Sequence, residues 1–453
     1  MNNIKETVEN RMCSGCGICA AICPKNAISL QFNVIGNLCP TIDDNCVNCG
    51  LCQKVCPGST QTSDYSIETN ELFIGNIEHA YIGRSLNKDI YKNSQSGGIV
   101  TALLNYLFDA KRIDAAIVAK SSYGHPYPKT EVVIITDAKQ LLETQKSIYT
   151  PVPIMEKLQE VKQYKSVAIV GLPCQFEALK LAQDRGRYKN IQYKIGLICD
   201  RILSRSIYLS LMPDEWKKCN DYSVAFKDKS YPLTEKEYAA VFRDKNYKNY
   251  KTACMVYKSK ETIIPLAPYP RHHAKDFFTH PRCRVCFNKL NVFADITCGD
   301  PWNMEGVDWV KGDSLVLSRT HLGAELLSEA SKDGVIQIKE CKVEDVVRAQ
   351  GIKSRQKRCL AGINIYRNHG WNLPALYGRI EKSNIYKNFS SIYKQENQYV
   401  SHFLENEKLP LDEILKKAEA FKQLNAIRMS RNLLKMKIKG YIKLIFKKML
   451  HKK

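Results

Sequence analysis

Eight cysteines near the N-terminus constrain this chain more than any other feature. They form two copies of the pattern C-x-x-C-x-x-C-x-x-x-C-P, which begin at Cys13 and Cys46. In such a pattern three thiolates on one tight loop reach different irons of a [4Fe-4S] cluster, and the fourth turns toward the other cluster. The spacing therefore predicts two crossed clusters, one held by Cys13, Cys16, Cys19 and Cys56 and the other by Cys46, Cys49, Cys52 and Cys23.

Two other uses of cysteine fit this stretch less well. A structural zinc site takes four ligands and gains nothing from the doubled pattern, and disulfides belong to secreted domains. Gly15, Gly17 and Gly50 suit a cluster, because glycine lets backbone amides turn toward charged sulfur atoms. Over about its first sixty residues the chain resembles the bacterial two-cluster ferredoxin domain. Cys39 lies outside the pattern and is expected to be an ordinary thiol.

The chain is long enough for further domains. Its 453 residues with 44% hydrophobic content predict two or three globular domains. The start, MNNIKETVEN, lacks the basic and apolar regions of a signal peptide, and no apolar run approaches the roughly eighteen residues of a membrane helix. With 18 cysteines and no export signal, the expected location is a reducing cytoplasm.

Strand-like and helix-like segments alternate after the cysteine-rich region. Strands are predicted at Ala115–Ala119, Val132–Thr136 and Val167–Gly171, with helical stretches at Ala138–Lys146 and Ile154–Tyr164. This alternation predicts an α/β layer with parallel pairing. Residues 220–268 contain short β-rich segments between charged turns and predict an antiparallel insertion. Within it, the basic and tyrosine-rich piece 243–251 fits a lysine-guarded hairpin edge better than a surface that stacks on nucleic acid.

Four more cysteines have spacings that suggest a third metal site. Cys174 and Cys199 each follow a predicted strand, at the sheet edge where sites in such folds usually lie. Cys283 and Cys286 form a C-x-x-C pair. Alone, that pair is half of a zinc site, with His280 as a further ligand, or half of a cluster site. Together with the first two cysteines it would complete a third [4Fe-4S] cluster, and both interpretations stay open.

A glycine turn precedes a helical pattern at residues 93–111. The turn contains Ser96, Gly97 and Gly98, and the apolar residues after it have helical spacing. A turn that leads into a helix start offers free amides to an anion such as a cofactor phosphate. A plain helix cap explains the same residues, and the sequence alone favours the cap.

Several of these segments occur together in a known family. SGGIVTALL (96–104), VGLPCQ (170–175), GLIC (196–199) and CRVCFNKLNVFADITCGD (283–300) resemble, in order, segments of the beta subunits of coenzyme F420 hydrogenases and dehydrogenases. The resemblance implies that one cluster is held by Cys174, Cys199, Cys283 and Cys286. It also implies FAD near Ser96, Gly97, Gly98 and Thr101, with Lys146 and Tyr149 as further candidates. Bacterial members, some resembling proteins encoded among polysaccharide-synthesis genes, occur where the deazaflavin coenzyme is not made.

The resemblance implies an iron–sulfur flavoprotein oxidoreductase. It would pass electrons between a soluble carrier, of ferredoxin or reduced flavin or deazaflavin type, and a small-molecule substrate such as a glycan precursor. The alternative is an electron-transfer subunit that serves a partner enzyme and has no substrate of its own. No arrangement of residues requires separate acid–base catalysis. Asp300 and His280 are candidate proton donors, although a structural role is expected for each.

The C-terminal tail is strongly basic. From Lys422 onward the chain carries eleven Lys and Arg residues and no Asp or Glu, which is half of the net charge of +22. From Ala426 the apolar residues fall near one helical face, which predicts a basic amphipathic helix. Such a helix suits an anionic surface, here the inner face of the cell membrane, or a partner protein. Nucleic acid is the weaker candidate partner.

Together these features predict a mixed α+β and α/β chain. A bacterial ferredoxin-like domain is followed by an α/β flavin and iron–sulfur domain with an antiparallel β insertion and by a basic C-terminal helix. The expected boundaries are 1–62 for the two-cluster domain, 63–79 for a linker, 80–360 for the flavin and iron–sulfur domain, 361–425 for a helical region and 426–453 for the basic tail.

Overall fold

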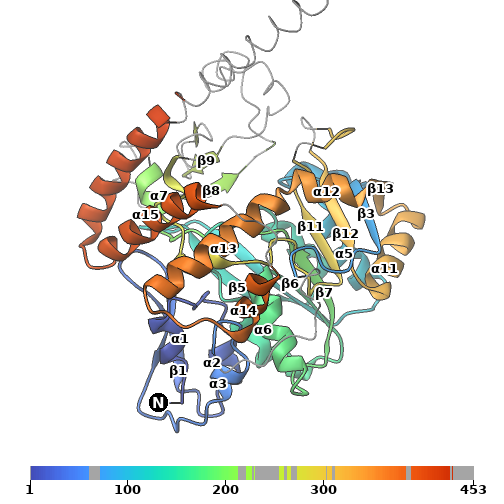
Figure 1. The fold of residues 1–453 in the computed structure, drawn as a ribbon. Coiled ribbons are helices and arrows are strands. Elements are labelled where there is room, and N and C mark those ends of the chain that lie inside the picture. The colour runs from blue at the N-terminus through green and yellow to red at the C-terminus, as the bar shows by residue number, and fades with distance from the viewer. Residues whose placement is uncertain are drawn as a thin grey trace, which may run out of the picture.

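A computed structural model gives the arrangement of most of the chain (Figure 1). The structure describes residues 2–60, 72–212, 221–226, 229, 255–259, 263–266, 273–302, 304–308, 312–383, 389–428 and 431. The basic and tyrosine-rich piece 243–251 and nearly all of the tail 426–453 lie outside these ranges, so the predictions made for them stay predictions. Within the described residues no helix is both long and apolar enough to cross a bilayer.

The main body is built on one sheet of eight strands in the order β13-β3-β12-β11-β7-β6-β4-β5. These strands are β3 (His79–Ser85), β4 (Ala115–Ser122), β5 (Lys129–Ile135), β6 (Val167–Gly171), β7 (Ile191–Leu197), β11 (Ile296–Gly299), β12 (Ser314–Ser318) and β13 (Ile336–Glu340). The four central strands β11, β7, β6 and β4 are parallel, and the outer strands pair antiparallel. Parallel pairing is therefore confirmed for the centre of the sheet only.

The helices and the smaller strands surround this sheet. The helices are α1 (Lys5–Glu9), α2 (Ile18–Ile22), α3 (Leu51–Lys54), α4 (Lys88–Asn93), α5 (Ile99–Asp109), α6 (Pro173–Gln183), α7 (Ile207–Leu211), α10 (Pro281–Val285), α11 (His321–Lys332), α12 (Val343–Ala349), α13 (Ile352–Asn368), α14 (Ala375–Lys382) and α15 (Ser390–Asn406). Residues 411–428 are also helical. Short 3-10 helices are η1 (Ala138–Thr144), η2 (Ile154–Leu158) and η3 (Glu160–Gln163), where longer helical stretches were predicted.

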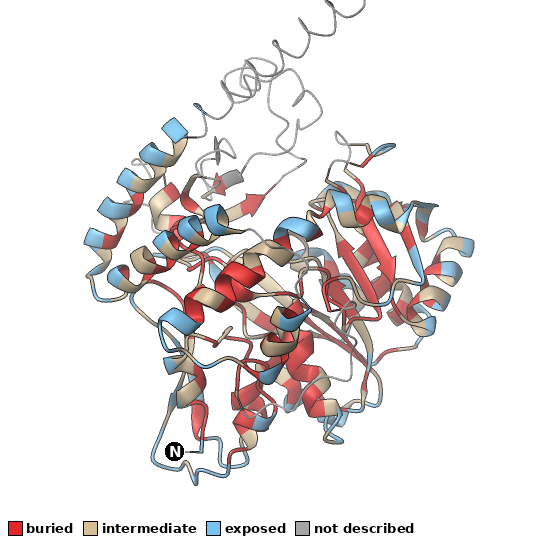
Figure 2. Ribbon diagram, viewed as in Figure 1, coloured by how far each residue is buried: buried red, intermediate tan, exposed pale blue. Residues whose placement is uncertain are grey.

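Both faces of the sheet are buried because its side chains alternate between two cores. Ala116 of β4 and Ala168 of β6 face a cluster that includes Leu103 of α5. Their neighbours Ala115 and Ile169 face the opposite cluster, which α6 and the N-terminal domain share. Figure 2 shows these central strands in the colour of buried residues. The sheet is thus a rigid platform for whatever lies at its strand ends.

The predicted antiparallel insertion is confirmed in its described part. The strands β8 (Ser223–Phe226), β9 (Met255–Lys258) and β10 (Ile263–Leu266) form a separate sheet in the order β10-β9-β8. Both pairings in this sheet are antiparallel.

The N-terminal domain contains one hairpin, β1 (Ile28–Phe32) with β2 (Leu38–Ile42), and it packs tightly against the main body. The backbone amide of Met155 donates to the carbonyl of Cys16 at 3.0 Å, and the Tyr188 hydroxyl donates to the carbonyl of Ala21 at 2.9 Å. At the hairpin, the Arg205 amide donates to the carbonyl of Gly36 at 2.9 Å. Figure 1 shows this domain, in blue, directly against the sheet domain.

Part of the segment predicted as a linker, 63–79, is core rather than linker. Leu72 and Phe73 are buried and belong to the core cluster that the N-terminal domain and the sheet share, and His79 already begins β3. The polar composition of residues 58–70 suggested a flexible connection. The two apolar side chains that follow it bury themselves because a shared core is available there.

Replacing Gly17 with alanine is expected to weaken this docking. Gly17 has a φ of 92°, and a Cβ added there would lie 2.7 Å from the backbone nitrogen of Glu156 and 2.9 Å from the carbonyl oxygen of Pro153. The backbone conformation costs about 1–2 kcal/mol for a residue other than glycine, and overpacking adds about 1–3 kcal/mol. We expect the free energy of urea unfolding to fall by about 2–5 kcal/mol.

Gly334→Ala is the matched control for that experiment. Gly334 has a φ of 68°, but nothing lies within 4 Å of a Cβ added there. Its replacement should therefore cost only the backbone part, about 1 kcal/mol. Equal losses in the two variants would contradict a tight contact between Gly17 and η2.

Candidate functional site

One cysteine-lined cavity lies at the outer end of the N-terminal domain. It holds about 320 Å³ of space, open solvent included, and four of its lining residues are Cys23, Cys46, Cys49 and Cys52. Cys23 follows α2 in the first motif, whereas the other three belong to the second motif. The structure therefore brings together the crossed set expected for one cluster. Cys49 is exposed, so this site reaches the protein surface.

The other crossed set lies deeper, beside the sheet domain. Burial raises the pKa of Cys19 well above its ordinary value, and the nearby thiols of Cys16, Cys13 and Cys56 raise it further. Burial likewise raises the pKa of Cys56 to about 12, with Cys16 again a close neighbour. These mutual effects indicate that the four thiols lie close together, with Cys16, Cys19 and Cys56 buried and Cys13 partly exposed. Cys39, on β2, is a further neighbour of Cys13.

The third set of cysteines lines a second and larger cavity. It holds about 580 Å³, open solvent included, and its lining contains Cys174, Cys199, Cys283 and Cys286. Cys13 of the N-terminal domain lines the same cavity. The third set is therefore in direct continuity with the inner thiols of the N-terminal domain.

The sheet topology explains how distant residues meet at this cavity. Cys174 lies in the first turn of α6, just after β6, and Cys199 lies just after β7. Because β6 and β7 are adjacent parallel strands, their carboxyl ends lie at the same sheet edge. Cys283 belongs to α10, and its sulfur accepts the Ile202 amide at 3.4 Å.

Burial keeps the metal-free thiols of Cys174, Cys199 and Cys286 protonated. It raises the pKa of Cys174 well above the ordinary value, and it raises the pKa of Cys286 to about 11. It raises the pKa of Cys199 in the same direction, and the thiols of Cys283 and Cys286 add to that effect. Metal binding replaces these protons, so it turns an unfavourable burial into a coordinated thiolate.

The geometry of the three sets differs from that of a single-ion site. Within the described residues, no three Cys, His, Asp or Glu side chains gather as closely as one metal ion requires. Zinc holds its thiolates at about 2.3 Å in a tetrahedron, whereas a [4Fe-4S] cluster takes one thiolate at each of four separate irons. Every described cysteine is also free of a disulfide. The donor chemistry, four thiolates in each set, fits clusters.

A network of charged side chains surrounds the third set. Burial opposes the charge of Asp200, yet the guanidinium groups of Arg201, Arg355 and Arg358 hold the pKa of its carboxyl well below the usual range. Arg355 also donates to the Asp200 carbonyl at 2.5 Å. The network fixes the loop after β7, which carries Cys199, and it surrounds the thiols with positive charge.

The two candidate proton donors have structural roles in this arrangement. His280 is the N-cap of α10, and its Nδ1 accepts the backbone amide of Arg282 at 3.1 Å. Burial lowers the pKa of His280 to about 3, and the Arg11, Arg282 and Arg284 charges lower it further, so the ring is neutral. Asp300 accepts a hydrogen bond from the Ser96 hydroxyl at 2.5 Å. Neither observation supports a role in proton transfer.

The turn before α5 has a clear structural role. The Gly97 amide donates to the Ser314 hydroxyl at 2.9 Å, and a Cβ on Gly97 would lie 2.3 Å from the carbonyl oxygen of Gly83. Gly98 is the N-cap of α5 with a φ of 77°, and Thr101 is buried in the first turn of that helix. Close packing on β3 and β12 therefore explains Gly97 without a ligand. The helix start has no side-chain cap, which leaves its first amides to another acceptor.

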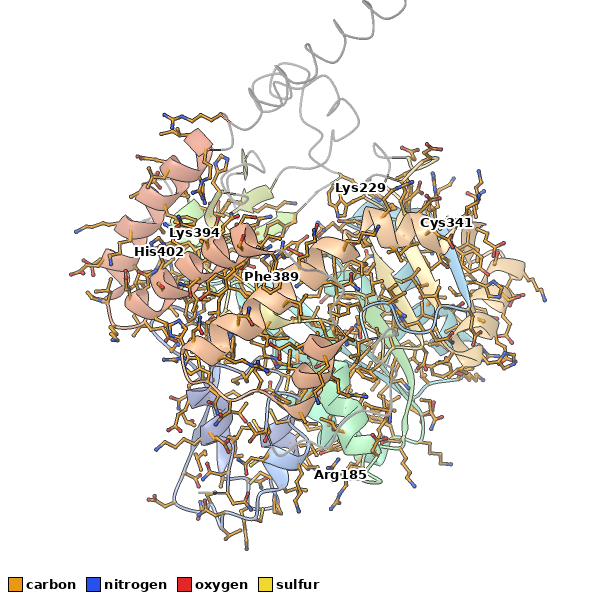
Figure 3. All side chains as sticks on the ribbon, in the orientation of Figure 1. Arg185, Lys229, Cys341, Phe389, Lys394 and His402 are labelled. Carbon is orange, nitrogen blue, oxygen red and sulfur yellow. The ribbon has the colours of Figure 1, made fainter. Side chains whose placement is uncertain are left out.

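The remaining flavin candidates lie beside the same turn. Gln95 connects the two segments, because its Nε2 donates to the Tyr149 hydroxyl at 3.2 Å and its Oε1 accepts the Ser147 amide at 3.1 Å. Lys146 precedes Ser147 and has a φ of 82°. Lys229, labelled in Figure 3, contacts this turn, and its Nζ donates to the Ser96 carbonyl at 2.6 Å. The structure thus brings all six candidates to one region and adds a cation there.

Hydrogen bonds connect this turn to the third set of cysteines. Asp300, which binds Ser96, follows β11, and β11 pairs in parallel with β7, which leads to Cys199. Gln350 donates to the Asp300 carbonyl at 2.8 Å, and its own carbonyl accepts from Lys289 at 2.5 Å. The Lys289 carbonyl accepts the Cys199 amide at 3.0 Å. The turn and the thiols therefore lie at neighbouring strand ends.

The sequence-based analysis missed the polar residues that hold the third set in place. Glu177 and Asn288 are buried and bonded to each other at 2.9 Å, and Arg282 pairs with Glu177. Two signals were available. Arg282 lies directly before the C-x-x-C pair. Glu177 lies three residues after Cys174, about one helical turn along α6. Because α6 is buried on most sides, its sequence has no clear polar and apolar faces that would have marked it as a helix.

The metal-free chain is expected to lose stability as the pH rises from 9 to 10. Cys174, Cys199 and Cys286 have pKa values raised by burial above 9.0, so the folded state keeps protons that the unfolded chain releases. Lys289 acts oppositely, because burial lowers its pKa to about 8. Each thiol that ionises only on unfolding contributes a loss of at most about 1.4 kcal/mol per pH unit, and Lys289 offsets part of the sum.

Urea unfolding under anaerobic reducing conditions with a chelator would measure this slope. Cys286→Ser should make the slope shallower by up to about 1.4 kcal/mol per pH unit, since one thiol with a raised pKa is gone. Stability that is constant or rising across this pH range would contradict the burial of protonated thiols.

Comparisons with known proteins agree with the order of these sites. Residues 12–60 match a 4Fe-4S dicluster domain. Residues 80–159 and 164–344 match the N-terminal and C-terminal family models described as coenzyme F420 hydrogenase/dehydrogenase, beta subunit. The three matched regions follow one another along the chain and include the candidate cysteines, Cys13–Cys56 in the first and Cys174, Cys199, Cys283 and Cys286 in the last.

Three similar proteins show what these matches cover. The beta subunit of coenzyme F420 hydrogenase from Methanosarcina barkeri is 26% identical over 58% of this chain and 84% of its own length. The beta subunit of coenzyme F420 hydrogenase from Methanothermobacter thermautotrophicus is 25% identical over 68% of this chain and 100% of its own length. The coenzyme F420-dependent sulfite reductase of Methanocaldococcus jannaschii is 31% identical over 43% of this chain and 32% of its own length.

A solved structure was also found to be similar. A chain of the F420-reducing [NiFe] hydrogenase complex from Methanosarcina barkeri superposes with a TM-score of 0.47 at 22% identity, covering 63% of this chain and 92% of that chain.

Proposed function

The chain belongs to the family of coenzyme F420 hydrogenase/dehydrogenase beta subunits and carries an N-terminal 4Fe-4S dicluster domain, and we propose that it is a flavin-dependent iron–sulfur oxidoreductase with three cluster sites. The family includes redox subunits, and electron transfer is the function that membership of this family supports directly. The cluster ligands, the flavin and the substrate are our proposal.

One observation carries this proposal. Cys13 of the dicluster domain lines the same cavity as Cys174, Cys199, Cys283 and Cys286 of the sheet domain. A structural zinc site would have no need to adjoin a cluster site, whereas a third cluster there would continue an electron path into the sheet domain. We therefore assign these last four cysteines as ligands of a third [4Fe-4S] cluster.

The three sites would form a path from the surface to the centre of the protein. The outer set contains the exposed Cys49, the inner set is buried, and the third set lies at the carboxyl ends of β6 and β7. When bound, clusters of this kind accept and release single electrons. The protein's own part is to hold the thiols, to exclude water from the inner sites and to supply compensating charge.

We place FAD at the turn before α5. The uncapped amides at the start of α5 and the nearby Lys229 ammonium would both suit an anionic phosphate group. Ser96, Gly98 and Thr101 belong to this turn and helix, and Lys146 and Tyr149 border it. A flavin there would exchange two electrons with a substrate and single electrons with the third cluster.

The proposal also covers the electron carrier and the acceptor. Relatives are named for coenzyme F420, so a deazaflavin carrier or a ferredoxin is the natural donor to test first, and a small metabolite such as a glycan precursor is the proposed acceptor. A second candidate function is an electron-transfer subunit without its own substrate, because two of the relatives cited above are named as subunits. Turnover by the isolated chain favours the first function, and turnover that requires a partner protein favours the second.

The test is the cofactor content of the anaerobically purified chain, with iron, zinc and flavin measured in one sample. About twelve irons and one flavin per chain would agree with three [4Fe-4S] clusters and FAD. About eight irons with one zinc and no flavin would contradict the third cluster and the flavin together, and would leave only the dicluster domain as a redox element.

A further inference from the structure

A single buried guanidinium lies between two of the proposed cluster sites. Arg282 is 7% exposed in its side chain, and its Nη2 lies 3.3 Å from Oε2 of Glu177, which is 2% exposed. Buried arginine is rare unless it is paired. Arg282 is not one of the proposed cluster ligands and has no role in the electron path proposed above, so its burial needs a separate explanation.

On one side Arg282 faces the inner set of the dicluster domain. Its Nη1 lies 3.9 Å from the sulfur of Met12, the residue directly before Cys13. Arg282 also lines the same cavity as Cys13 of this set. The guanidinium is therefore close enough to stabilise negative charge on this set.

On the other side Arg282 faces the third set. Arg282 directly precedes Cys283, and it lines the same cavity as Cys174, Cys199, Cys283 and Cys286. One cation thus acts on two sets of thiols that belong to different domains. Its partner Glu177 is held in turn by Asn288, whose Nδ2 donates to Oε1 at 2.9 Å.

A second arginine on the same helix provides a contrast. Arg284 is 2% exposed and pairs with Glu396 of α15 at 2.6 Å. Its guanidinium also lies over the Tyr399 ring, 4.9 Å from the centroid. Arg284 therefore points toward the C-terminal helices, and the same helix α10 carries one buried cation toward the thiols and one away from them.

We propose that Arg282 is a shared positive charge that raises the reduction potentials of both the inner dicluster site and the third site. This inference rests on the proposed function, since it requires a cluster at each site. A [4Fe-4S] cluster with four thiolates is an anion that becomes more negative on reduction, so a fixed cation in a low-dielectric interior favours the reduced form. Reduction adds one electron to either site, and no bond or proton is involved.

The position between the sites has a second effect. An electron on one site disfavours an electron on the other by repulsion, and the cation attracts both electrons, so its attraction stabilises the doubly reduced state twice. Both sites can then be reduced together. That property would let the path store the two electrons that a flavin exchanges in one step.

The test is a potentiometric titration of the intact holoprotein, followed by electron paramagnetic resonance of the reduced clusters. Arg282→Gln should shift the reduction equilibrium of both sites at least tenfold toward the oxidised form, which is about 59 mV for a one-electron couple. Glu177→Gln should shift both sites in the opposite direction. Arg282→Lys keeps the charge and should shift them less than Arg282→Gln does.

Arg284→Gln is the matched control, because it removes an equally buried and paired arginine from the same helix. It should leave the reduction equilibrium of each site within threefold of its value in the unmodified protein. Full iron content with unmoved potentials in Arg282→Gln, or a shift at only one site, would overturn the shared-charge inference alone. Zinc at the third site of the unmodified chain would overturn the proposed function as well. If Arg282→Gln does not retain iron, the opposite shifts expected of Glu177→Gln decide the question.

Discussion

Replacing Cys283 and Cys286 together with alanine is expected to lower the iron content from about twelve to about eight per chain, with the dicluster domain unaffected. Two of the four thiols of the third set would be lost, and the two remaining thiolates cannot hold a cluster of four irons. Electron transfer between the flavin and the dicluster domain should fall below detection. Iron analysis and the spectrum of the remaining clusters measure the outcome.

Cys359→Ala is the control for that variant. Cys359 is buried on α13 and its thiol donates to the Val285 carbonyl of α10 at 3.0 Å, yet it does not line the cavity. Its replacement should therefore keep all the iron. If the double variant also kept all its iron, the assignment of the third cluster would be wrong, and if it lost one zinc instead, the site would be a structural zinc site.

Removing iron is expected to unfold the dicluster domain while the sheet domain stays folded. Residues 2–60 contain helices of only four or five residues and one hairpin of two five-residue strands. A unit of this size seldom supports itself without metal ligands. Without the clusters, two poorly filled sites lined by thiols would remain. Metal binding and folding are coupled in such domains, so the loss of iron removes part of the folding free energy.

Hydrogen exchange measured by mass spectrometry would resolve this prediction by region. Exchange in residues 2–60 should accelerate at least about 100-fold, equivalent to about 2.7 kcal/mol of lost protection, whereas β6, β7 and β11 should keep theirs. Reconstitution with iron and sulfide is the control, and it should restore the slow exchange. Uniform acceleration across both domains would instead indicate one cooperative unit that depends on the clusters as a whole.

The chain's local patterns predicted those parts of the architecture that depend on short segments. The β6 strand Val167–Gly171 has the predicted bounds, because a run of apolar residues ended by glycine and proline is unambiguous. The crossed grouping of Cys23 with Cys46, Cys49 and Cys52 in one cavity also follows from spacing alone. The antiparallel insertion was equally visible from its short strands.

Long-range features were not predictable from local patterns. The outer strands β3, β12 and β13 pair antiparallel, and nothing in their own residues distinguishes an edge from the centre. The shared core that takes in Leu72 and Phe73, and the pairing of Arg282 with Glu177, are contacts between segments far apart in the sequence. Such contacts exist only once the sheet has brought the strand ends together.

The tight contact between the N-terminal domain and the sheet domain has a consequence for kinetics. Many electron carriers deliver electrons by swinging on a tether, and their rates fall as the solvent becomes more viscous. Here Cys16, Ala21 and Gly36 are hydrogen-bonded directly to the main body. Electron transfer between the proposed cluster sites would therefore require no movement of one domain relative to the other. Added glycerol or sucrose would then slow the arrival of an external donor at Cys49, but would leave the internal steps unchanged.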